Sequence, residues 1–262
     1  MTLLGFDIVH PSRTATWRVL RGDELSGSAH GLCRPDGRWF VSVDTWDDDE
    51  LQPLVEAMAE DLRHDLYTML DEDDRELDRW LELGFAVRRR EVRYRMPVDP
   101  ARTGLATAVT DLDVVLLAAD VVDEALLRRL DDELRTDVPG AQGWRNDPEE
   151  FAQYTFGSRQ FDPATYLVAV DDTAAAFAGL VRVWNIPTIP RLGLIGVTRA
   201  YRRRGLARVL LGAAFAALHE RGVAFVDAEV DGANAASIAL LTGIGAVPTG
   251  ANLELIRPYR HT

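Results

Sequence analysis

The feature that most restricts the fold is an alternation of strand-like and helix-like patterns along the second half of the chain. Apolar residues at helical spacing, or a capping pattern, predict helices over 122–136, 147–154, 203–221 and 233–242. Short apolar or alternating runs predict strands over 113–119, 166–170, 176–184, 192–198 and 224–230, and a final pair of strands around 246–256. Strands that alternate with helices are typical of an α/β sheet.

The first half repeats the later part of this order in a shortened form. The repeated elements are strand-like at 39–43, 66–70 and 87–96, and helix-like at 51–62 and 75–83. Three turn-forming residues, Pro97, Pro100 and Gly104, lie between the halves. We therefore expect a shortened, degenerate domain over 1–98, a linker over 99–110 and a second domain over 111–262.

Composition excludes several classes of function. All of the 29 basic residues are arginine, so the chain has no lysine for a Schiff base, a pyridoxal-phosphate enzyme or a Walker-type phosphate loop. A net charge of −13 argues against nucleic-acid or anionic-membrane partners. The single cysteine, Cys33, and the lack of signal-peptide features before Pro11 indicate a cytoplasmic protein. No uncharged apolar run reaches the ~20 residues of a membrane helix, and five scattered histidines (His10, His30, His64, His219, His261) predict no metal site.

The segment 194–210 has the clearest chemical signal. A strand leads into a helix through a turn that contains five arginines, namely Arg199, Arg202, Arg203, Arg204 and Arg208. Such crowding of like charge requires bound anions or carboxylates from elsewhere in the fold. A helix start also offers free backbone N–H groups, which favours a phosphate or pyrophosphate site. The alternative is a solvated arginine run on the surface.

This segment also resembles a known family. Residues 202–207 (RRRGLA) are similar to the (Gln/Arg)-x-x-Gly-x-(Gly/Ala) acyl-CoA signature of the GNAT superfamily of N-acyltransferases. Residues 195–197 resemble the central strand of that family, and 234–245 resemble its second motif. The resemblance covers most of 111–258, and the repeated first half is similar to the layout of tandem GNAT proteins.

The resemblance implies a GNAT fold and acetyl-CoA as the acyl donor. Backbone N–H groups of 203–208 would hold the pyrophosphate, and the central strand, splayed from the next one, would pair with the pantetheine arm. The implied cofactor-binding residues are Ile195, Gly196, Val197, Arg202, Arg203, Arg204, Gly205, Leu206, Ala207, Arg208 and Asn234. The Val197 N–H would stabilise the developing oxyanion. Asn234 has a simple helix cap as its alternative role.

The catalytic acid and base are less clear. Many family members have a tyrosine acid where this chain has Leu241, and the central strand 192–198 has no carboxylate. On the next strand, acids alternate with apolar residues, and we select Glu229 as the base; an acidic outer face or an arginine counter-ion is the alternative. Tyr154, Trp144 and Trp184 are candidates for substrate contact, with core packing as the alternative for the first two.

The first half should not bind CoA. At the place that corresponds to the arginine-rich turn, residues 44–50 read DTWDDDE and would repel a pyrophosphate. We expect an acetyl-CoA-dependent N-acetyltransferase, a monomer or homodimer, that acts on a small-molecule amine in a direct ternary complex, since Cys33 lies in the degenerate half. The alternatives are an acyl-CoA-binding sensor or scaffold without catalysis, and a peptide or protein N-acetyltransferase.

Overall fold

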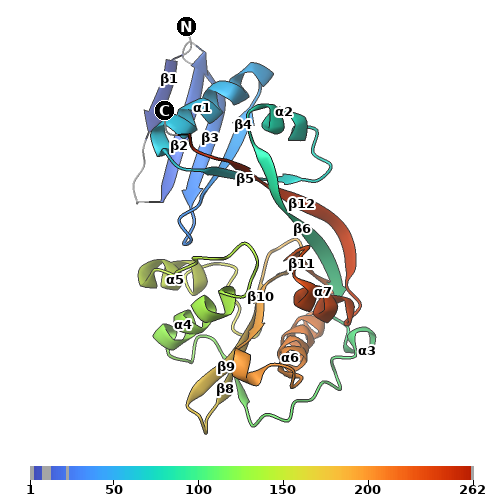
Figure 1. Ribbon diagram of the computed structural model, residues 1–262. Helices are drawn as coiled ribbons and strands as arrows, with labels where there is room; N and C mark the ends of the chain where they lie inside the picture. The colour runs from blue at the N-terminus through green and yellow to red at the C-terminus, as the bar shows by residue number, and fades with distance from the viewer. Residues whose placement is uncertain (1–2, 8–12, 22–23, 261–262) are drawn as a thin grey trace. The chain divides into compact units, whose positions relative to one another are not determined.

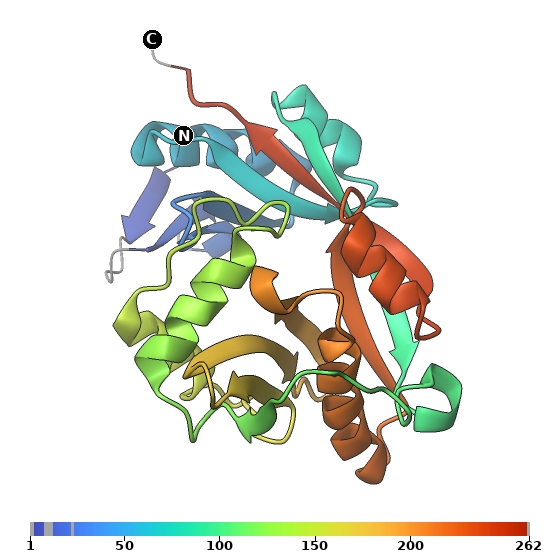
Figure 2. The same ribbon diagram turned by 60° about the horizontal axis from the view of Figure 1, so that its bottom comes forward.

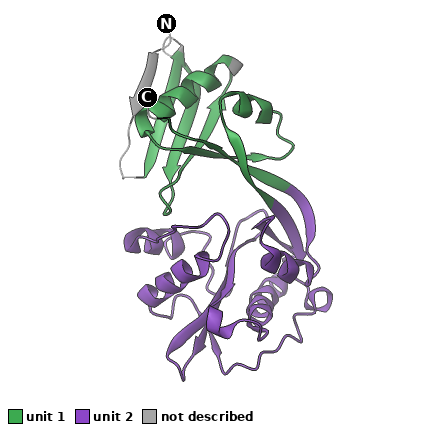
Figure 3. Ribbon diagram, in the orientation of Figure 1, with its two compact units in different colours: residues 1–91, 251–262 green, residues 92–250 purple. Residues whose placement is uncertain are grey.

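The computed structural model describes residues 3–7, 13–21 and 24–260 (Figure 1). These residues form two compact units, which Figure 3 distinguishes by colour. Unit 1 contains residues 1–91 and 251–262, and unit 2 contains residues 92–250. Two strands, β6 (Ala86–Pro97) and β12 (Val247–Arg257), therefore begin in one unit and end in the other.

The sheet of unit 1 begins as an antiparallel meander and continues with a parallel pair. Its strands are β1 (Leu3–Asp7), β2 (Thr14–Arg21), β3 (Glu24–Cys33), β4 (Trp39–Thr45) and β5 (Leu66–Asp71). Its helices are the 3-10 turn η1 (Asp48–Glu50), α1 (Leu51–Leu62) and α2 (Leu77–Glu82). Helix α1 is the crossover between the parallel strands β4 and β5. Their ladder has two residue pairs and ends at Phe40↔Tyr67.

Helix α1 packs on this sheet because its apolar residues recur every three or four positions. Leu51, Leu54 and Met58 are buried in one cluster with Trp17 of β2. The indole Nε1 of Trp17 donates to Asp61 Oδ2 at 2.8 Å, so its polar atom keeps a partner under the helix.

Unit 2 is an α/β sheet with helices on both faces, in the strand order β6, β11, β10, β9, β8, β7. Its further strands are β7 (Val115–Ala118), β8 (Tyr166–Asp171), β9 (Ala176–Trp184), β10 (Arg191–Val197) and β11 (Phe225–Asp231). Its helices are α3 (Pro100–Thr103), α4 (Glu124–Arg135), α5 (Pro148–Thr155), η2 (Arg199–Tyr201), α6 (Leu206–Glu220) and α7 (Ala235–Thr242).

A separate apolar cluster lies on each face of the unit 2 sheet. On one face, Leu210 and Phe215 of α6 are buried together with Val226 of β11. On the other face, Leu134 of α4 is buried together with Leu180 of β9. Figure 2 shows α4 and α5 apart from α6 and α7, with the strands between them. The mixed α/β fold predicted from the sequence is confirmed.

Two details differ from the sequence prediction. The region 246–256 is one strand, β12, rather than a pair of strands. Strands β1, β2 and β3 were not predicted, and in β3 the buried positions are small residues with little apolar signal. The Trp17 ring fills the space beside one of them, since a Cβ on Gly31 would lie 3.2 Å from it.

The compact units also differ from the predicted contiguous domains 1–98 and 111–262. Residues 252–257 of β12 pair antiparallel with β5 inside unit 1. The end of β6 lies next to β11 inside unit 2, where Arg95 Nε donates to Asp227 Oδ1 at 2.8 Å. Each half of the chain therefore gives its last strand to the sheet of the other unit.

A buried ion cluster fixes the exchanged strand in unit 1. The side chain of Glu254 on β12 is fully buried and accepts hydrogen bonds from Arg88 and from Arg89, whose Nε lies 2.8 Å from Glu254 Oε2. Burial alone would raise the pKa of Glu254, but the hydrogen bonds and charges of Arg89 and Arg88 hold it below its usual value.

We expect Glu254→Gln to lower the free energy of unfolding by about 2–3 kcal/mol at pH 7, because two arginines lose a buried charged acceptor. Because the folded-state pKa of Glu254 is lowered, its stabilisation is complete above the unfolded pKa of about 4.3 and is lost as pH falls through the folded pKa. Urea unfolding at several pH values measures this, and the wild-type advantage should shrink below about pH 4. Glu72→Gln, which breaks an exposed pair with Arg90, is the matched control and should have little effect. A pH-independent difference would contradict the assignment.

Candidate functional site

Strand β10 separates from β11 near the middle of the unit 2 sheet. Their ladder ends at Leu192, whereas β10 stays paired with β9 as far as Val197. The separation begins at a β-bulge at Gly193. Beyond it, the edge of residues 194–197 that faces β11 has no ladder partner in the described chain. An open strand edge can pair with an extended ligand.

A cavity of about 600 Å³ lies at this open edge, bounded by β10, the end of α4 and the starts of α6 and α7. All predicted cofactor-binding residues except Arg204 line it. They are Ile195, Gly196, Val197, Arg202, Arg203, Gly205, Leu206, Ala207, Arg208 and Asn234. These predicted residues, which span 39 positions from Ile195 to Asn234, are thus brought to one cavity.

The start of α6 presents unpaired backbone donors to this cavity. The N–H groups of residues 203–207 donate to no acceptor within the described ranges. Gly205 precedes the helix with φ +82°, and a Cβ there would lie 2.2 Å from the carbonyl oxygen of Val109. Only glycine fits this position. A helix start with free N–H groups carries partial positive charge and suits a phosphate.

The arginines around this turn are mostly balanced by carboxylates and carbonyls. Arg202 Nη2 donates to Asp137 Oδ2 at 2.6 Å, and Arg204 Nε donates to Asp111 Oδ1 at 2.8 Å. These hydrogen bonds lower the pKa of Asp137 and of Asp111 below the usual value. Arg208 Nη2 donates to a backbone carbonyl. Within the described part of the chain, Arg203 has no hydrogen bond or ion pair and is exposed.

Asn234 lies where either of its two predicted roles, helix cap or cofactor contact, is sterically possible. Its Oδ1 accepts a hydrogen bond from the Ser237 N–H at 3.1 Å, which makes it the N-cap of α7, and its side chain also lines the cavity. The cap role is confirmed, and contact with a pantetheine arm stays a prediction.

Glu229 and Trp184 lie at the point where β10 leaves β11. Trp184 pairs with Arg191 across the β9–β10 ladder, and its indole Nε1 would be 2.5 Å from a Cβ at Gly193. Arg191 Nη1 donates to Glu229 Oε2 at 3.1 Å. The predicted alternation on β11 is confirmed, since Glu229 is exposed and Val230 is buried. Glu229 therefore has the arginine counter-ion role that the sequence left open, at the edge of the splay and outside the cavity lining.

A buried polar network extends from Trp184 toward α4. The Arg182 guanidinium lies 4.8 Å from the centre of the Trp184 ring and donates to Asp131 Oδ2 at 3.0 Å. Asp131 also accepts from Arg135 of α4, which in turn stacks 4.2 Å from the Trp144 ring. Burial alone would raise the pKa of Asp131, but the charges of Arg182 and Arg135 lower it. Trp144 is thus a packing partner of Arg135.

The remaining candidates are placed differently. Tyr154 on α5 is 64% exposed, so core packing is not its role, and it does not line the cavity. Leu241 is buried in the α6 side core, so its position offers no acid at the cavity. The sequence analysis missed Asp137 and Tyr201, which line the cavity. The only sequence signal for Asp137 was the general need for acids near the arginine turn.

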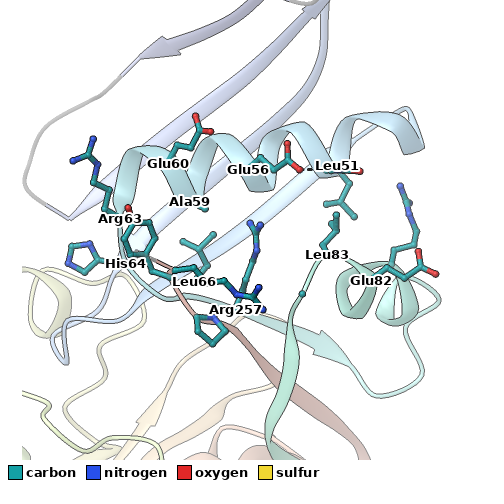
Figure 4. A pocket seen from close by; sticks show the side chains of 16 residues that line it. Leu51, Glu56, Ala59, Glu60, Arg63, His64, Leu66, Glu82, Leu83 and Arg257 are labelled. Carbon is teal, nitrogen blue, oxygen red and sulfur yellow. Dashed lines mark hydrogen bonds between the residues drawn. The ribbon is translucent and has the colours of Figure 1, made fainter. Parts of the chain in front are cut away.

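Unit 1 has a larger cavity, of about 1080 Å³, between α1, α2 and the segment after β12 (Figure 4). Glu56, Glu60 and Glu82 line it together with Arg63 and Arg257, so its charge is mixed. No residue of the acidic loop 44–50 is part of this lining.

That acidic loop differs from the turn before α6 in the polarity of its helix start. Glu50, directly before α1, is buried and accepts a hydrogen bond from Ser26 Oγ at 2.6 Å. A carboxylate therefore lies where a phosphate-binding helix start would need positive charge. Trp46 in the same loop is 80% exposed.

Within residues 3–7, 13–21 and 24–260, no three His, Cys, Asp or Glu side chains are grouped to hold a metal ion. His10 and His261 lie outside the described residues. The helices of the described chain are too short or too polar to cross a bilayer. Cys33 lies at the end of β3, in unit 1.

Comparisons with known proteins agree with this geometry. Residues 127–245 match the acetyltransferase (GNAT) family. A search of curated proteins finds no match by sequence. Among solved structures, a GCN5-related N-acetyltransferase from Sphaerobacter thermophilus is similar over 94% of this chain and 81% of its own, with a TM-score of 0.70 and 20% identity.

Two further structures share the fold over nearly the whole chain. A tandem GNAT protein from the clavulanic acid biosynthesis pathway is similar over 97% of this chain and 86% of its own, with a TM-score of 0.69 and 16% identity. A GCN5-related N-acetyltransferase from Kribbella flavida is similar over 91% of this chain and 90% of its own, with a TM-score of 0.58 and 16% identity. At these identities the likeness establishes the fold.

The contact at Gly205 generates a stability prediction. Gly205→Ala should lower the free energy of unfolding by at least about 1 kcal/mol more than Gly222→Ala, because only the first adds overpacking. Gly222 is the matched control, since it has φ +78° and no atom within 4 Å of the added Cβ. Urea unfolding measures both variants, and equal losses would show that the Val109 contact relaxes freely.

Proposed function

We propose that this chain transfers an acetyl group from acetyl-CoA to a small-molecule amine, because residues 127–245 match the acetyltransferase (GNAT) family. The observation that carries this proposal is the cavity in which the open edge of β10 meets the unpaired N–H groups before α6. One wall suits an extended amide-bearing arm, and the other suits a pyrophosphate. We also propose that the protein is cytoplasmic and acts as a monomer or homodimer.

The residues of the cavity fit acetyl-CoA, which would supply the acyl group as a thioester. The N–H groups of 203–207 would hold the pyrophosphate, and exposed Arg203 would add a charge-assisted contact. The backbone of Ile195 and Val197 would pair with the pantetheine arm, and the Val197 N–H would donate to the developing oxyanion.

The amine would approach from the face of the sheet that carries Trp184 and Glu229. We propose that the Glu229 carboxylate, which Arg191 holds at the splay, accepts a proton from the incoming ammonium and leaves a neutral nucleophile. As the new C–N bond forms and the C–S bond breaks, the nitrogen loses its second proton to the departing thiolate. The thiolate therefore leaves without a protein acid, which a thiol pKa of about 8.5 permits. The buried position of Leu241 is consistent with that route.

The second candidate is an acyl-CoA-binding sensor without catalysis. It is favoured by the ion pair of Glu229 with Arg191 and by Leu241 in the core, because neither position then offers a free acid or base at the cavity. The two candidates agree on cofactor binding and differ on turnover.

Cofactor binding is tested by isothermal titration with CoA. We expect one site per chain, because unit 1 has a carboxylate at the corresponding helix start. Arg203→Glu should weaken binding at least about tenfold by placing a negative charge beside the pyrophosphate. Arg129→Glu, an exposed charge reversal on α4 that does not line the cavity, should bind as the wild type does. Equal affinities for the two variants would show that the phosphates bind elsewhere.

Turnover is tested with a panel of amines and acetyl-CoA, by mass spectrometry of the products. The absence of lysine makes this assay clean, because self-acetylation could occur only at the N-terminal amine. We expect an acetylated product with at least one amine, and a drop in kcat/KM of about 10²-fold or more for Glu229→Gln. CoA binding without any product would favour the sensor, and an active Glu229→Gln variant would remove Glu229 as the base.

A further inference from the structure

Asp137 places a negative charge inside a cavity that is otherwise built for anions. It follows α4, and its carboxylate lines the cavity together with the arginine-rich turn. Its Oδ2 accepts from Arg202 Nη2 at 2.6 Å, and its Oδ1 lies 3.9 Å from Arg199 Nη2. A carboxylate offers arginine the same charge-assisted, oxygen-based contact that a phosphate does.

The same arginine also covers the open strand edge. Arg202 Nε donates to the carbonyl oxygen of Val197 at 2.8 Å, so one guanidinium joins Asp137 to the backbone of β10. Val197 is the last residue of that edge and lines the cavity. In this arrangement the Arg202 guanidinium is paired with Asp137, and the Val197 carbonyl already accepts a hydrogen bond. An extended, phosphate-bearing ligand would need both groups.

We propose that Asp137 is a latch: an internal competitor of the cofactor phosphates that holds Arg202 across the open edge of β10 until a phosphate displaces it. The proposal rests on the proposed function, because it takes CoA as the ligand. Displacement of Asp137 frees Arg202 for the phosphate and the Val197 carbonyl for the pantetheine arm in one step. The apparent affinity for CoA is then the intrinsic affinity reduced by the fraction of molecules with the latch open.

The latch also connects the cavity to the network on the α4 side. Arg135 lies two residues before Asp137, and it contacts Asp131 and stacks on Trp144 of the following loop. Asp137 is accordingly a positioning residue, since it acts through Arg202.

Asp111 provides a matched control for the test. Its carboxylate accepts from Arg204 of the same turn at 2.8 Å, but neither Asp111 nor Arg204 lines the cavity. Both Asp137→Asn and Asp111→Asn remove one negative charge near the turn. Only Asp137→Asn removes the carboxylate that holds Arg202. Comparison of the two variants therefore separates a long-range effect of net charge on CoA from the displacement of Asp137 by a phosphate.

Isothermal titration with CoA should give tighter binding for Asp137→Asn, by about three- to fivefold, which is the upper part of the range for one exposed ion pair. Asp111→Asn should stay within about twofold of the wild type, because exposed charges are screened. Asp137→Glu should return the affinity toward the wild-type value. In steady-state assays, Asp137→Asn should lower the KM for acetyl-CoA and leave kcat within about twofold, a split that loss of structure would not produce.

A double-mutant cycle with Arg202→Gln completes the test. In that background Asp137→Asn should no longer change CoA affinity, because the cation that Asp137 holds is gone. Equal tightening by Asp137→Asn and Asp111→Asn, or an unchanged effect in the Arg202→Gln background, would overturn the latch while leaving the proposed function intact. If neither the wild type nor Asp137→Asn binds CoA, the proposed cofactor is wrong, and the latch falls with it.

Discussion

The separation of β10 from β11 at the Gly193 bulge is the constraint on which the rest of unit 2 depends. Because β10 stays hydrogen-bonded to β9, the separation exposes one backbone edge without loosening the sheet. The cavity opens on that edge, and Trp184 packs against the bulge. Gly193 has no side chain to prevent this contact, so a single residue allows both the cavity and its neighbouring face to form.

Charge is distributed so that an acidic chain has a positively charged turn next to the cavity of unit 2. The turn before α6 and the first turn of that helix carry five arginines, yet carboxylates or carbonyls hold several of them. The backbone N–H groups of residues 203–207 donate to no acceptor in the described residues. Unit 1 has the same parallel crossover, with a ladder that also ends after two pairs, between β4 and β5. Its helix start is preceded by buried Glu50 instead of a glycine. The two halves thus share topology and differ in the one place where a phosphate would bind.

Local pattern in the sequence predicted the helices and strands of unit 2, because amphipathic helices alternate there with apolar strands. The arginine-rich turn, with the family resemblance, also predicted which residues meet at the cavity. The exchange of β6 and β12 could not be predicted, because the apolar pattern of a strand does not specify which strand lies next to it. Glu229 was placed on the correct face, but its pairing with Arg191 depends on register. Asp137 had no periodic signal, since it is a lone acid after a helix.

The strand exchange has a consequence for the order of folding during synthesis. Unit 2 consists of one continuous stretch, 92–250, and all of it leaves the ribosome before residues 251–257. Unit 1 is synthesised first, but β5 has no partner from β12 until that last strand emerges, and Glu254 arrives with it. The N-terminal unit therefore exposes an unpaired sheet edge for most of translation. During that time Arg88 and Arg89 lack the Glu254 carboxylate that they bind in the folded protein. The unit that is made first is completed last.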